Sequence, residues 1–251
     1  MATPDNVLEP VVRKLEVRTP LDNRDREALL ALPVTLRTLE PATYLVREGD
    51  PPRHCSMLLS GFAYRQKITG EGARQIIGLH VPGDILDLQN LYLHVSDHNV
   101  QTLSRAEVAF VAKTDIQQLA EERPAIAHAF FVDTLVDASI FREWVVNVGR
   151  RDSRARLAHL LCEFALRLEA VGLAEEYSYE LPMTQEQLAD AVGLTPVHVN
   201  RTLKTLDAES LIVRAKRNLK IPDWQRLRKA ADFSERYLHL HQREGEGVLS
   251  H

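Results

Sequence analysis

The spacing of apolar residues divides this chain into a helical start, a β-rich middle and a helical remainder. In residues 7–32, apolar side chains recur at intervals of three and four around a polar stretch, which predicts short helices packed outside a sheet domain. From residue 34 to residue 112, short β-rich runs alternate with turn residues, as in a sandwich or a double-sheet jelly roll. The expected strands are Val34–Leu39, Thr43–Val46, Ser56–Gln66, Gln75–Val81, Val100–Leu103 and Glu107–Val111.

A helical pattern returns at Thr114, with a short helix expected over 115–122 and a longer one that Pro124 opens and Gly149 closes. The longer helix carries a continuous apolar stripe with further apolar residues on its flanks, Leu135 and Trp144 among them, which is more apolar area than a helix with one buried side needs. We therefore expect a dimerisation helix; the alternative is a helix that packs only on the sheet domain. The residues assigned to the dimer interface are Phe130, Thr134, Ala138, Phe141, Val145 and Val148.

After an arginine-rich stretch and a further amphipathic helix that Gly172 ends, the stretch 183–221 has the pattern of two capped helices. Thr184 can cap the first of them with Gln187 at the capping-box position, and Gly193 ends it. Thr195 can cap the second, with Pro196 at its first position. This order of caps and turn predicts a helix-turn-helix.

The second of these helices has two chemically different sides. Val199, Leu203 and Leu206 recur along one side and should face inward. The opposite side carries amide, guanidinium and ammonium groups suited to base edges and phosphates, with one apolar residue among them. These outer residues are Val197, Asn200, Arg201 and Lys204.

Beyond the second helix, two short strands joined by a basic tip should form a wing. From residue 196 to residue 220 there are six Lys/Arg against two acidic residues, a balance that favours a phosphate backbone. The alternative is an ordinary helical hairpin with a solvated charged loop. The residues assigned to DNA binding are Thr184, Gln185, Thr195, Val197, His198, Asn200, Arg201, Lys204, Arg214, Lys216 and Arg217.

These residues are expected to divide into base readers and backbone contacts. Arg201 can donate two hydrogen bonds to guanine O6 and N7, Val197 can touch a thymine methyl group, and Asn200 can contact adenine or phosphate. The positions chosen for the phosphate backbone are Thr195, His198 and the basic residues of the wing.

Composition places the positive charge with the helix-turn-helix. The chain of 251 residues has a formal net charge of −4, and its 45% hydrophobic and 26% charged residues are ordinary for a soluble protein with room for two cores. Residues 149–230 hold 14 Lys/Arg against 11 Asp/Glu, whereas the rest of the chain holds 17 against 24. The basic excess is therefore local to the predicted DNA-binding segment.

Cysteine use and the first residues predict a cytoplasmic protein. Cys55 and Cys162 are the only cysteines and lie far apart, so neither a disulfide framework nor a CxxC site is expected. No apolar run approaches the ~18 residues of a membrane span. The stretch MATPDNVLEP lacks the charged-then-apolar pattern of a signal peptide. We therefore expect no membrane association.

With a β domain, a long helix and a winged helix in this order, the chain resembles bacterial transcription regulators of the cyclic-AMP receptor protein and fumarate-nitrate regulator (Crp/Fnr) family. The resemblance covers nearly the whole chain. It rests on Glu48-Gly49-Asp50, Leu58-Leu59-Ser60-Gly61, Pro82-Gly83-Asp84, Arg150 to His159 and, most specifically, TQEQLADAVGLTPVHVNRTLKTL.

The resemblance implies an α+β fold with a cyclic-nucleotide-binding-like β jelly roll, a long dimerisation helix and a C-terminal winged helix-turn-helix whose recognition helix enters the major groove. The expected parts are a sensor domain over residues 1–113, a dimerisation helix region over 114–149, a DNA-binding domain over 150–230 and a C-terminal tail over 231–251.

The resemblance also places an effector pocket around Gly83, Asp84, Ser96, Asp97 and His98. Cyclic-nucleotide members of the family carry a Gly-Glu pair and later a phosphate-binding Arg-Ser/Thr-Ala. Here Gly83-Asp84 matches the pair approximately, and the later stretch reads Ser96-Asp97-His98-Asn99, without arginine. A carboxylate at that point would repel a phosphate by roughly 4 kcal/mol at ~4 Å with an effective dielectric of about 20. Cyclic AMP is therefore not expected as the effector.

No cofactor or metal is expected. Oxygen-sensing members of the family bind an iron–sulfur cluster through several cysteines, most of them near the N-terminus, and this chain has none before Cys55. A haem ligand could come from His80, His94, His98 or Cys55, yet isolated histidines on a β domain are more often satisfied or solvated. Cys55 beside His54 could be a redox-sensitive thiol; the alternative is a plain packed or surface cysteine.

Catalytic patterns such as HExxH, GxSxG or a Gly-rich phosphate loop do not occur in the sequence, so an enzyme is not expected. We expect a homodimer that binds a two-fold symmetric DNA operator and recruits or blocks RNA polymerase, with an unknown small-molecule effector or none. The best-known family members have a glutamate where Val197 stands, so their operator sequence should not be assumed. The alternative is a nucleotide- or small-molecule-binding sensory module that signals through protein partners and shows no salt-sensitive DNA binding.

Overall fold

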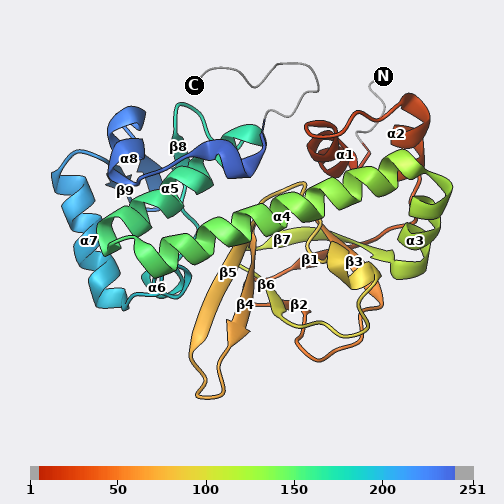
Figure 1. Ribbon diagram of the computed structural model, residues 1–251, viewed down its shortest axis with the longest axis horizontal. Coiled ribbons are helices and arrows are strands. Elements are labelled where there is room, and N and C mark those ends of the chain that lie inside the picture. Colours follow the sequence, from red (N-terminus) through yellow and green to blue (C-terminus); the bar gives the residue numbers. More distant parts are fainter. Residues whose placement is uncertain (1–5, 241–251) are drawn as a thin grey trace.

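The computed structural model describes residues 6–240, and one long helix, α4 (Pro124–Arg150), runs across the whole of it (Figure 1). In the view of Figure 1 the sheets of the N-terminal half lie below α4 and the two N-terminal helices, α1 (Glu9–Glu16) and α2 (Asn23–Leu30), lie above it, with α1 also in contact with the β1-β7-β3 sheet. The helices of the C-terminal half gather around the C-terminal end of α4. The α+β class and the order of sheet domain, long helix and helix-turn-helix domain are as predicted.

Two antiparallel sheets form the strand-rich half within residues 6–240, with strand orders β1-β7-β3 and β2-β6-β4-β5. Leu58 and Val108 of the first sheet and Ala63 and Val100 of the second are fully buried in one core, so the two sheets face each other. The expected single strand over Ser56–Gln66 is two strands, because the chain turns at Gly61. The strands are β1 (Thr35–Leu39), β2 (Tyr44–Val46), β3 (His54–Ser60), β4 (Ala63–Ile68), β5 (Arg74–His80), β6 (Asn99–Thr102) and β7 (Ala106–Ala112).

A second core lies between the β1-β7-β3 sheet and the surrounding helices. Val12 of α1, Met57 of β3, Ile116 of α3 (Lys113–Glu122) and Ile126 of α4 are buried together there. Leu88 and Leu91, at the ends of the 3-10 helix η1 (Leu88–Leu91), join the same cluster. The N-terminal helices therefore pack outside the sheets, as their apolar spacing predicted.

The C-terminal half is a winged helix. α5 (Ser153–Ala170) is followed by α6 (Gln185–Val192) and α7 (Pro196–Ala208), and the sheet β8-β10-β9 stands beside them. The wing is the antiparallel pair β9 (Val213–Ala215) and β10 (Asn218–Lys220); the third strand, β8 (Ser178–Glu180), was not expected from the sequence. The helix α8 (Trp224–Ala230) follows the wing.

One apolar cluster crosses the boundary between the two halves. Tyr64 and Ile76 from strands β4 and β5 are buried in the same cluster as Leu161 of α5, Val192 of α6 and Leu206 of α7. β5 therefore packs directly against the helix-turn-helix, and the two halves share a continuous interior.

The segment that follows α8 belongs to this shared interior. Phe233, Tyr237 and Leu238 are at most 9% exposed, and the last two belong to the 3-10 helix η2 (Glu235–Leu238). Residues 231–240 of the segment expected as a C-terminal tail are therefore packed into this interior. The remainder of that segment, residues 241–251, lies outside the described residues.

α4 corrects a second expectation. It is long and apolar enough to cross a membrane by length and composition, with a mean hydropathy of 1.3 over 18 residues, although no such stretch was expected. However, Phe130 and Trp144 of α4 are buried in the protein's own cores, and Asp133 is ion-paired there. This side of α4 therefore packs within the protein.

Candidate nucleic-acid interface and interdomain cavity

The helix-turn-helix is held by the capping groups that the sequence predicted. Thr184 Oγ1 accepts a hydrogen bond from the Gln187 backbone N–H at 3.2 Å, and the Gln187 side chain accepts one from the Thr184 N–H at 2.9 Å. Gly193 ends α6 with φ of 64°, a left-handed conformation that an L side chain rarely adopts. Thr195 Oγ1 then accepts from the His198 N–H at 3.3 Å and starts α7. These caps fix the angle at which α7 leaves the turn.

The exposed side of α7 has the residues expected to meet DNA. Val199, Leu203 and Leu206 are 0–2% exposed and face the core, so the opposite side points to solvent. On that side Val197 is 81% exposed, an unusual position for an apolar residue. Arg201 and Lys204 follow it at intervals of four and three and are also exposed. Within residues 6–240 no acidic side chain pairs with either cation.

The other predicted DNA contacts lie around this side of α7. Thr184 and Gln185 are exposed at the start of α6, and Asn200 is half-buried beside Arg201. His198 is also half-buried, and its Nε2 lies 3.1 Å from Ser153 Oγ at the start of α5. The His198 ring therefore holds α7 to α5.

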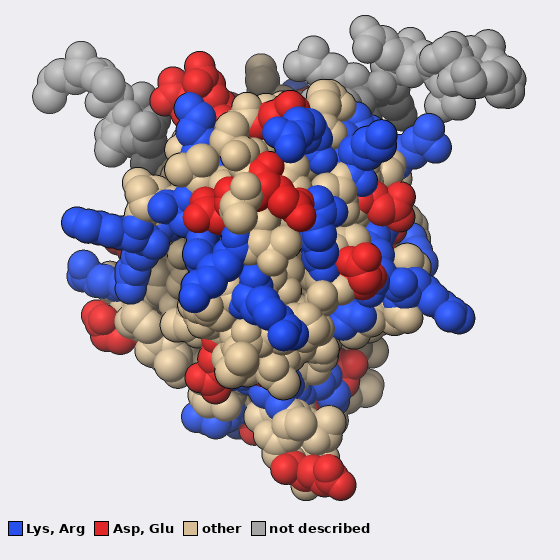
Figure 2. Space-filling view, turned by 90° about the vertical axis from the view of Figure 1, so that its left-hand side faces the viewer, with Lys and Arg blue, Asp and Glu red and all other residues tan. Residues whose placement is uncertain are grey.

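The wing presents its basic residues at a tight turn. Lys216 has φ of 58°, and both Lys216 and Arg217 are exposed at the tip. Arg217 lies 3.6 Å from Glu180 of β8, and Arg214 is half-buried. Figure 2 shows the side of the molecule on which α7 lies: Lys and Arg side chains spread across the middle of it, with acidic side chains between them.

The uncovered side of α4 differs from the predicted dimer seam at one end. Phe130 is 5% exposed and lies in the sensor core with Ile126 and Ala129, so it cannot be part of a seam; the exposed residue at that level is Phe131, at 61%. The error arises because neighbouring helical residues are 100° apart, and the sensor core occupies the Phe130 side.

The rest of the predicted seam is more accessible. Thr134 is exposed, Ala138 is half-exposed, and Phe141 and Val145 are 48% and 58% exposed. Leu135, at 51%, adds to this surface. Val148 is half-buried beside Gly193 of the helix-turn-helix, so its side chain contacts the protein's own turn.

The predicted effector residues do not gather in one pocket. Gly83 has φ of 91°, and a Cβ there would lie 2.8 Å from the Pro10 carbonyl oxygen, so its role is close packing against α1. Ser96 is buried and its Oγ accepts from Asn90 Nδ2 at 3.2 Å. The Asp97 side chain is 78% exposed, and its carboxylate lies 2.6 Å from Nδ1 of the buried His98. Of the five candidates, only Asp84 lines the large cavity described next.

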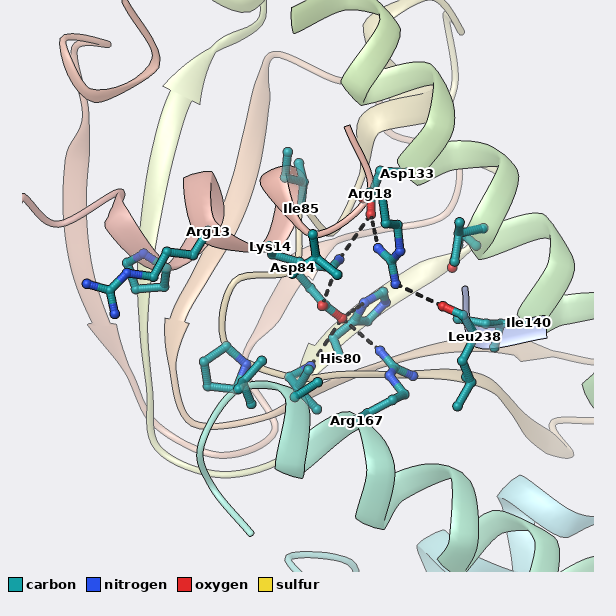
Figure 3. Close-up of a pocket in the computed structure, with 18 of the residues that line it drawn as sticks. Arg13, Lys14, Arg18, His80, Asp84, Ile85, Asp133, Ile140, Arg167 and Leu238 are labelled. Atoms are coloured by element: carbon teal, nitrogen blue, oxygen red, sulfur yellow. Dashed lines mark hydrogen bonds and ion pairs between the residues drawn. The ribbon is translucent and has the colours of Figure 1, made fainter. Parts of the chain in front are cut away.

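A cavity of about 610 Å³ opens where α1, the sheets, α4, α5 and the C-terminal segment meet (Figure 3). Its charged residues pair with one another across these elements. Asp84 accepts from Lys14 Nζ and from Arg167 Nη2, each at 2.9 Å, and lies 3.3 Å from His80 Nδ1. Asp133 of α4 receives Arg18 at 3.0 Å and Lys14 at 3.3 Å.

A further pair on the same side of α4 continues this cluster. Arg65 of β4 donates to Asp137 of α4 at 2.6 Å and to the Leu86 carbonyl oxygen at 3.0 Å. Sequence reasoning missed Lys14, Arg18, Arg65 and Arg167, because their partners are distant in sequence and no local pattern marks them.

Burial and charge act in opposite directions on these groups. Burial opposes ionisation of Asp84, but Lys14 and Arg167 outweigh it and hold the pKa of this carboxyl well below its usual range. Burial lowers the pKa of His80 despite the hydrogen bond to Asp84, so the ring is neutral near pH 7. Its Nε2 has no hydrogen-bond partner within the described residues.

Cys55, the candidate redox thiol, is 1% exposed in the core between β3 and α4. Burial and the nearby Asp87 carboxylate raise its pKa well above the usual value for a thiol. Reactive cysteines need the opposite environment, partly exposed and electropositive. The structure favours the alternative of a packed cysteine.

Two family models match this chain in the order of its two halves. Residues 36–123 match the cyclic nucleotide-binding domain, and residues 155–230 match the Crp-like helix-turn-helix domain. The first match covers the two facing sheets and α3, and the second covers α5 to α8.

Named relatives and solved structures agree with these matches. The chain is 26% identical to the transcriptional activator protein FnrL of Cereibacter sphaeroides, over 79% of this chain and 82% of that protein. It is 29% identical to the nitrogen fixation regulation protein FixK of Bradyrhizobium diazoefficiens, over 62% and 64%. The fold is similar to that of FixK2 from Bradyrhizobium japonicum, with a TM-score of 0.73 at 22% identity, over 79% of this chain and 98% of that one.

Proposed function

Because this chain belongs to the Crp/Fnr family of DNA-binding transcription regulators, we propose that it acts as a homodimer that binds a two-fold symmetric operator without cyclic AMP. In this proposal α7 is the recognition helix and α4 supplies the dimer seam. The protein works in the cytoplasm, where it reaches the DNA. Its relatives are named as regulators, and we assign this chain the same role and no enzymatic activity.

The observation that carries the proposal is the exposed side of α7. Arg201 and Lys204 have no acidic partner within residues 6–240, and Val197 is 81% exposed between them and the turn. An arginine with free N–H groups can bind guanine O6 and N7, and an exposed valine suits a thymine methyl group. Lys216 and Arg217 at the wing would then contact phosphates and hold α7 in its groove.

The uncovered apolar side of α4 supports the dimer. Phe131, Leu135, Phe141 and Val145 are 48–61% exposed along one helix, whereas isolated exposed apolar residues are the rule elsewhere on a protein surface. A second copy of the chain can cover this side through a two-fold axis. A two-fold operator requires two recognition helices about 34 Å apart, one turn of B-DNA, and in this proposal the dimer sets that spacing.

Independence from cyclic AMP has two supports. The stretch Ser96 to His98 offers no guanidinium, and the exposed Asp97 carboxylate would repel a phosphate. Four cations that line the larger cavity, Lys14, Arg18, Arg65 and Arg167, are already paired with the carboxylates of Asp84, Asp133 and Asp137. A cyclic nucleotide would have to break these pairs to bind.

We place the protein at promoters, where it contacts RNA polymerase or hinders it. Its relative FnrL is named a transcriptional activator, which favours recruitment. Selection of genomic DNA fragments by the purified protein, followed by mobility shifts between low and physiological salt, tests the proposal. We expect two-fold symmetric sites that bind far more tightly than random DNA, and salt-sensitive binding to both. Fragments enriched without any two-fold symmetry would contradict it.

A further inference from the structure

Arg167 of α5 reaches across the boundary between the two halves. It belongs to the segment that matches the helix-turn-helix domain, whereas its partner Asp84 belongs to the segment that matches the cyclic nucleotide-binding domain. The Nη2 to Oδ2 distance is 2.9 Å, and the side chains of Arg167 and Asp84 are only 11% and 4% exposed. Figure 3 shows Arg167 and Lys14 pointing to the Asp84 carboxylate from separate helices.

The Asp84 end of this pair is firmly placed. Its carboxylate also accepts from the Val81 backbone N–H at 3.1 Å and pairs with Lys14 of α1 at 2.9 Å. Asp84 follows Gly83, whose backbone lies against Pro10 of α1. The carboxylate is therefore a fixed point of the sensor half.

The Arg167 end continues into the rest of the C-terminal half. Arg167 Nη1 lies 3.6 Å from Glu163, one turn earlier on α5. The Glu163 carboxylate accepts from Trp144 Nε1 of α4 at 3.0 Å and from the Tyr237 hydroxyl at 2.8 Å. Through this chain of contacts α5 is tied to the end of α4 and to the C-terminal segment.

α5 in turn carries the recognition helix. Leu157 and Leu161 of α5 are fully buried in the same cluster as Val199 and Leu203 of α7. His198 of α7 contacts Ser153 of α5 at 3.1 Å. A packed interior transmits a displacement because it cannot be compressed locally, so a shift of α5 on the sensor moves α7 as well.

We propose that Arg167 is the positioning residue of the DNA-binding half: its pair with Asp84 holds α5, and with it α7, in the orientation that operator binding requires. The DNA-binding part of this inference rests on the dimeric operator binding proposed above. Arg167 and Asp84 contact each other directly, so the pair forms without a bound ligand. We call the ion pairs around the cavity the interdomain junction. Its cations pair with its carboxylates; the cations are Lys14, Arg18, Arg65 and Arg167, and the carboxylates are Asp84, Asp133, Asp137 and Glu163.

A second contact between the halves is weaker. Arg74 Nε of β5 lies 2.6 Å from Asp190 Oδ2 of α6, but the two side chains are 28% and 22% exposed. A pair that water reaches contributes little, whereas removing one partner of a buried pair leaves an uncompensated charge. Arg167 should therefore matter more to the orientation of α7 than Arg74 does.

The experiment compares Arg167→Met with Arg13→Met. Arg13 borders the same cavity, but its side chain is 70% exposed and pairs with Glu9 on its own helix, so it controls for loss of a nearby charge. Binding to a selected operator and to random DNA is measured for each variant. We expect Arg167→Met to weaken operator binding by roughly 5- to 150-fold, with less than about a twofold change on random DNA. Arg13→Met should match the wild type on both.

A distance measurement tests the orientation without DNA. Cysteines introduced at Glu107 on β7 and Ala215 on the wing are exposed, whereas Cys55 and Cys162 are buried, so spin labels attach selectively. We expect a narrow distance distribution in the otherwise wild-type protein and in Arg13→Met, and a broadened or shifted one in Arg167→Met. An unchanged distribution in a folded Arg167→Met would overturn the inference. If that variant broadens while no protein binds a two-fold operator, the proposed function fails and the positioning role stands.

Variants on the sensor side keep the test open if Arg167→Met does not fold. Asp84→Asn should cause the same broadening from the other half of the molecule, and Arg167→Lys, which keeps the charge, should cause less. The double variant Asp84→Asn/Arg167→Met should lose less operator affinity than the two single losses combined, because neither charge then remains unpaired. Fully additive losses would contradict a direct coupling between the two residues.

Discussion

The interdomain junction and the outer surface of the DNA-binding half contain the same kinds of side chain in opposite situations. At the junction, the side chains of Arg18 and Arg167 are only 9% and 11% exposed and are paired with carboxylates. On α7, Arg201 and Lys204 are exposed and have no acidic partner within residues 6–240. The junction balances its cations with carboxylates, whereas the exposed side of α7 leaves its cations unbalanced. The cations that the protein leaves unpaired are the ones available to a partner.

Apolar side chains divide in the same way along α4. Phe130 and Trp144 are 5% exposed in the protein's own cores, whereas Phe131 and Val145, one residue further on, are 61% and 58% exposed. One side of α4 is covered by the protein's own residues, and the other side is exposed to solvent. The comparison predicts that substitutions on the exposed sides of α4 and α7 affect dimerisation and DNA binding. Substitutions at the junction should affect the stability of the protein and the orientation of α7.

The largest effect is expected from a charge on the uncovered side of α4. Phe141→Glu places a carboxylate at the seam in both subunits and removes apolar contacts worth roughly 1.5–3 kcal/mol for each fully buried side chain. We expect a folded monomer that binds its operator at least about 100-fold more weakly and keeps weak, salt-sensitive binding to any DNA. Sedimentation measures the assembly state, and circular dichroism checks the fold.

The matched control for this variant is Leu36→Glu. Leu36 is 52% exposed on β1, an edge strand of the sheet β1-β7-β3, so a carboxylate there should leave the dimer intact. A folded wild-type monomer, or a Phe141→Glu protein that dimerises like the wild type, would mean that the exposed apolar side of α4 is not the dimer interface.

A smaller and more selective loss is expected at α7. Arg201→Ala should cost on the order of 1–3 kcal/mol at the operator and little on random DNA, because a guanine contact is lost and a phosphate contact is not. Lys216→Ala at the wing tip should weaken both DNAs alike and lower the salt slope by about 1. Titrations at several salt concentrations distinguish the two outcomes. Equal losses on both DNAs for Arg201→Ala would remove it from the base readers.

Asp87 is a buried carboxyl that forms no ion pair with a Lys, Arg or His side chain of residues 6–240. Asp87 accepts from the Ser56 N–H at 2.8 Å, but burial raises its pKa from 3.8 to about 6. The folded protein therefore holds this proton more tightly than the unfolded chain, and the contribution of Asp87 to stability falls as pH rises from about 4 to about 6. Between about pH 4.5 and pH 7 the fall amounts to about 2 kcal/mol.

Asp87→Asn should remove this fall, so the variant should gain relative stability toward neutral pH. Urea unfolding of both proteins across that range measures it. Asp84, three residues earlier, should act with the opposite sign: its pKa is depressed, so its contribution is present at neutral pH and lost as pH falls below its ordinary value. A wild-type slope that persists in Asp87→Asn would assign the proton to another group.

The smallest effect is expected from cyclic AMP. Calorimetry should detect no specific binding, and operator affinity should change by less than about twofold, since a ligand shifts an equilibrium only by its differential affinity. Cyclic GMP serves as a second probe. A micromolar dissociation constant with a matching rise in operator affinity would overturn the proposed independence from cyclic AMP.

The helix-turn-helix could be predicted nearly to the residue, because its signals are local. Thr184 pairs with Gln187 and Thr195 with His198, each over three residues, and the structure confirms both caps and the Gly193 end of α6. The strands of the sensor were also close to their predicted bounds, since turn residues separate them. The strand β8 was missed because it is three residues long and its partner β10 lies 40 residues later.

The rest depends on contacts between distant parts of the chain. Periodicity gave the long helix but not which side the sensor would occupy, so Phe130 was assigned to the seam in place of Phe131. The pair of Asp84 and Arg167 joins residues 83 apart, and no spacing rule points from one to the other. Asp97 and His98 were grouped with Asp84 by resemblance, but the structure places Asp97 at the surface.

The apolar cluster shared by the two halves has a consequence for synthesis on the ribosome. Tyr64, Ile76 and Leu79 leave the ribosome early, while their partners on α6 and α7 are more than 100 residues behind them. Domains that are made first usually fold first. Here the apolar surface of the sensor half around Tyr64, Ile76 and Leu79 stays uncovered until the last third of the chain has been made. A prematurely terminated chain would therefore expose this surface, aggregate readily and bind chaperones.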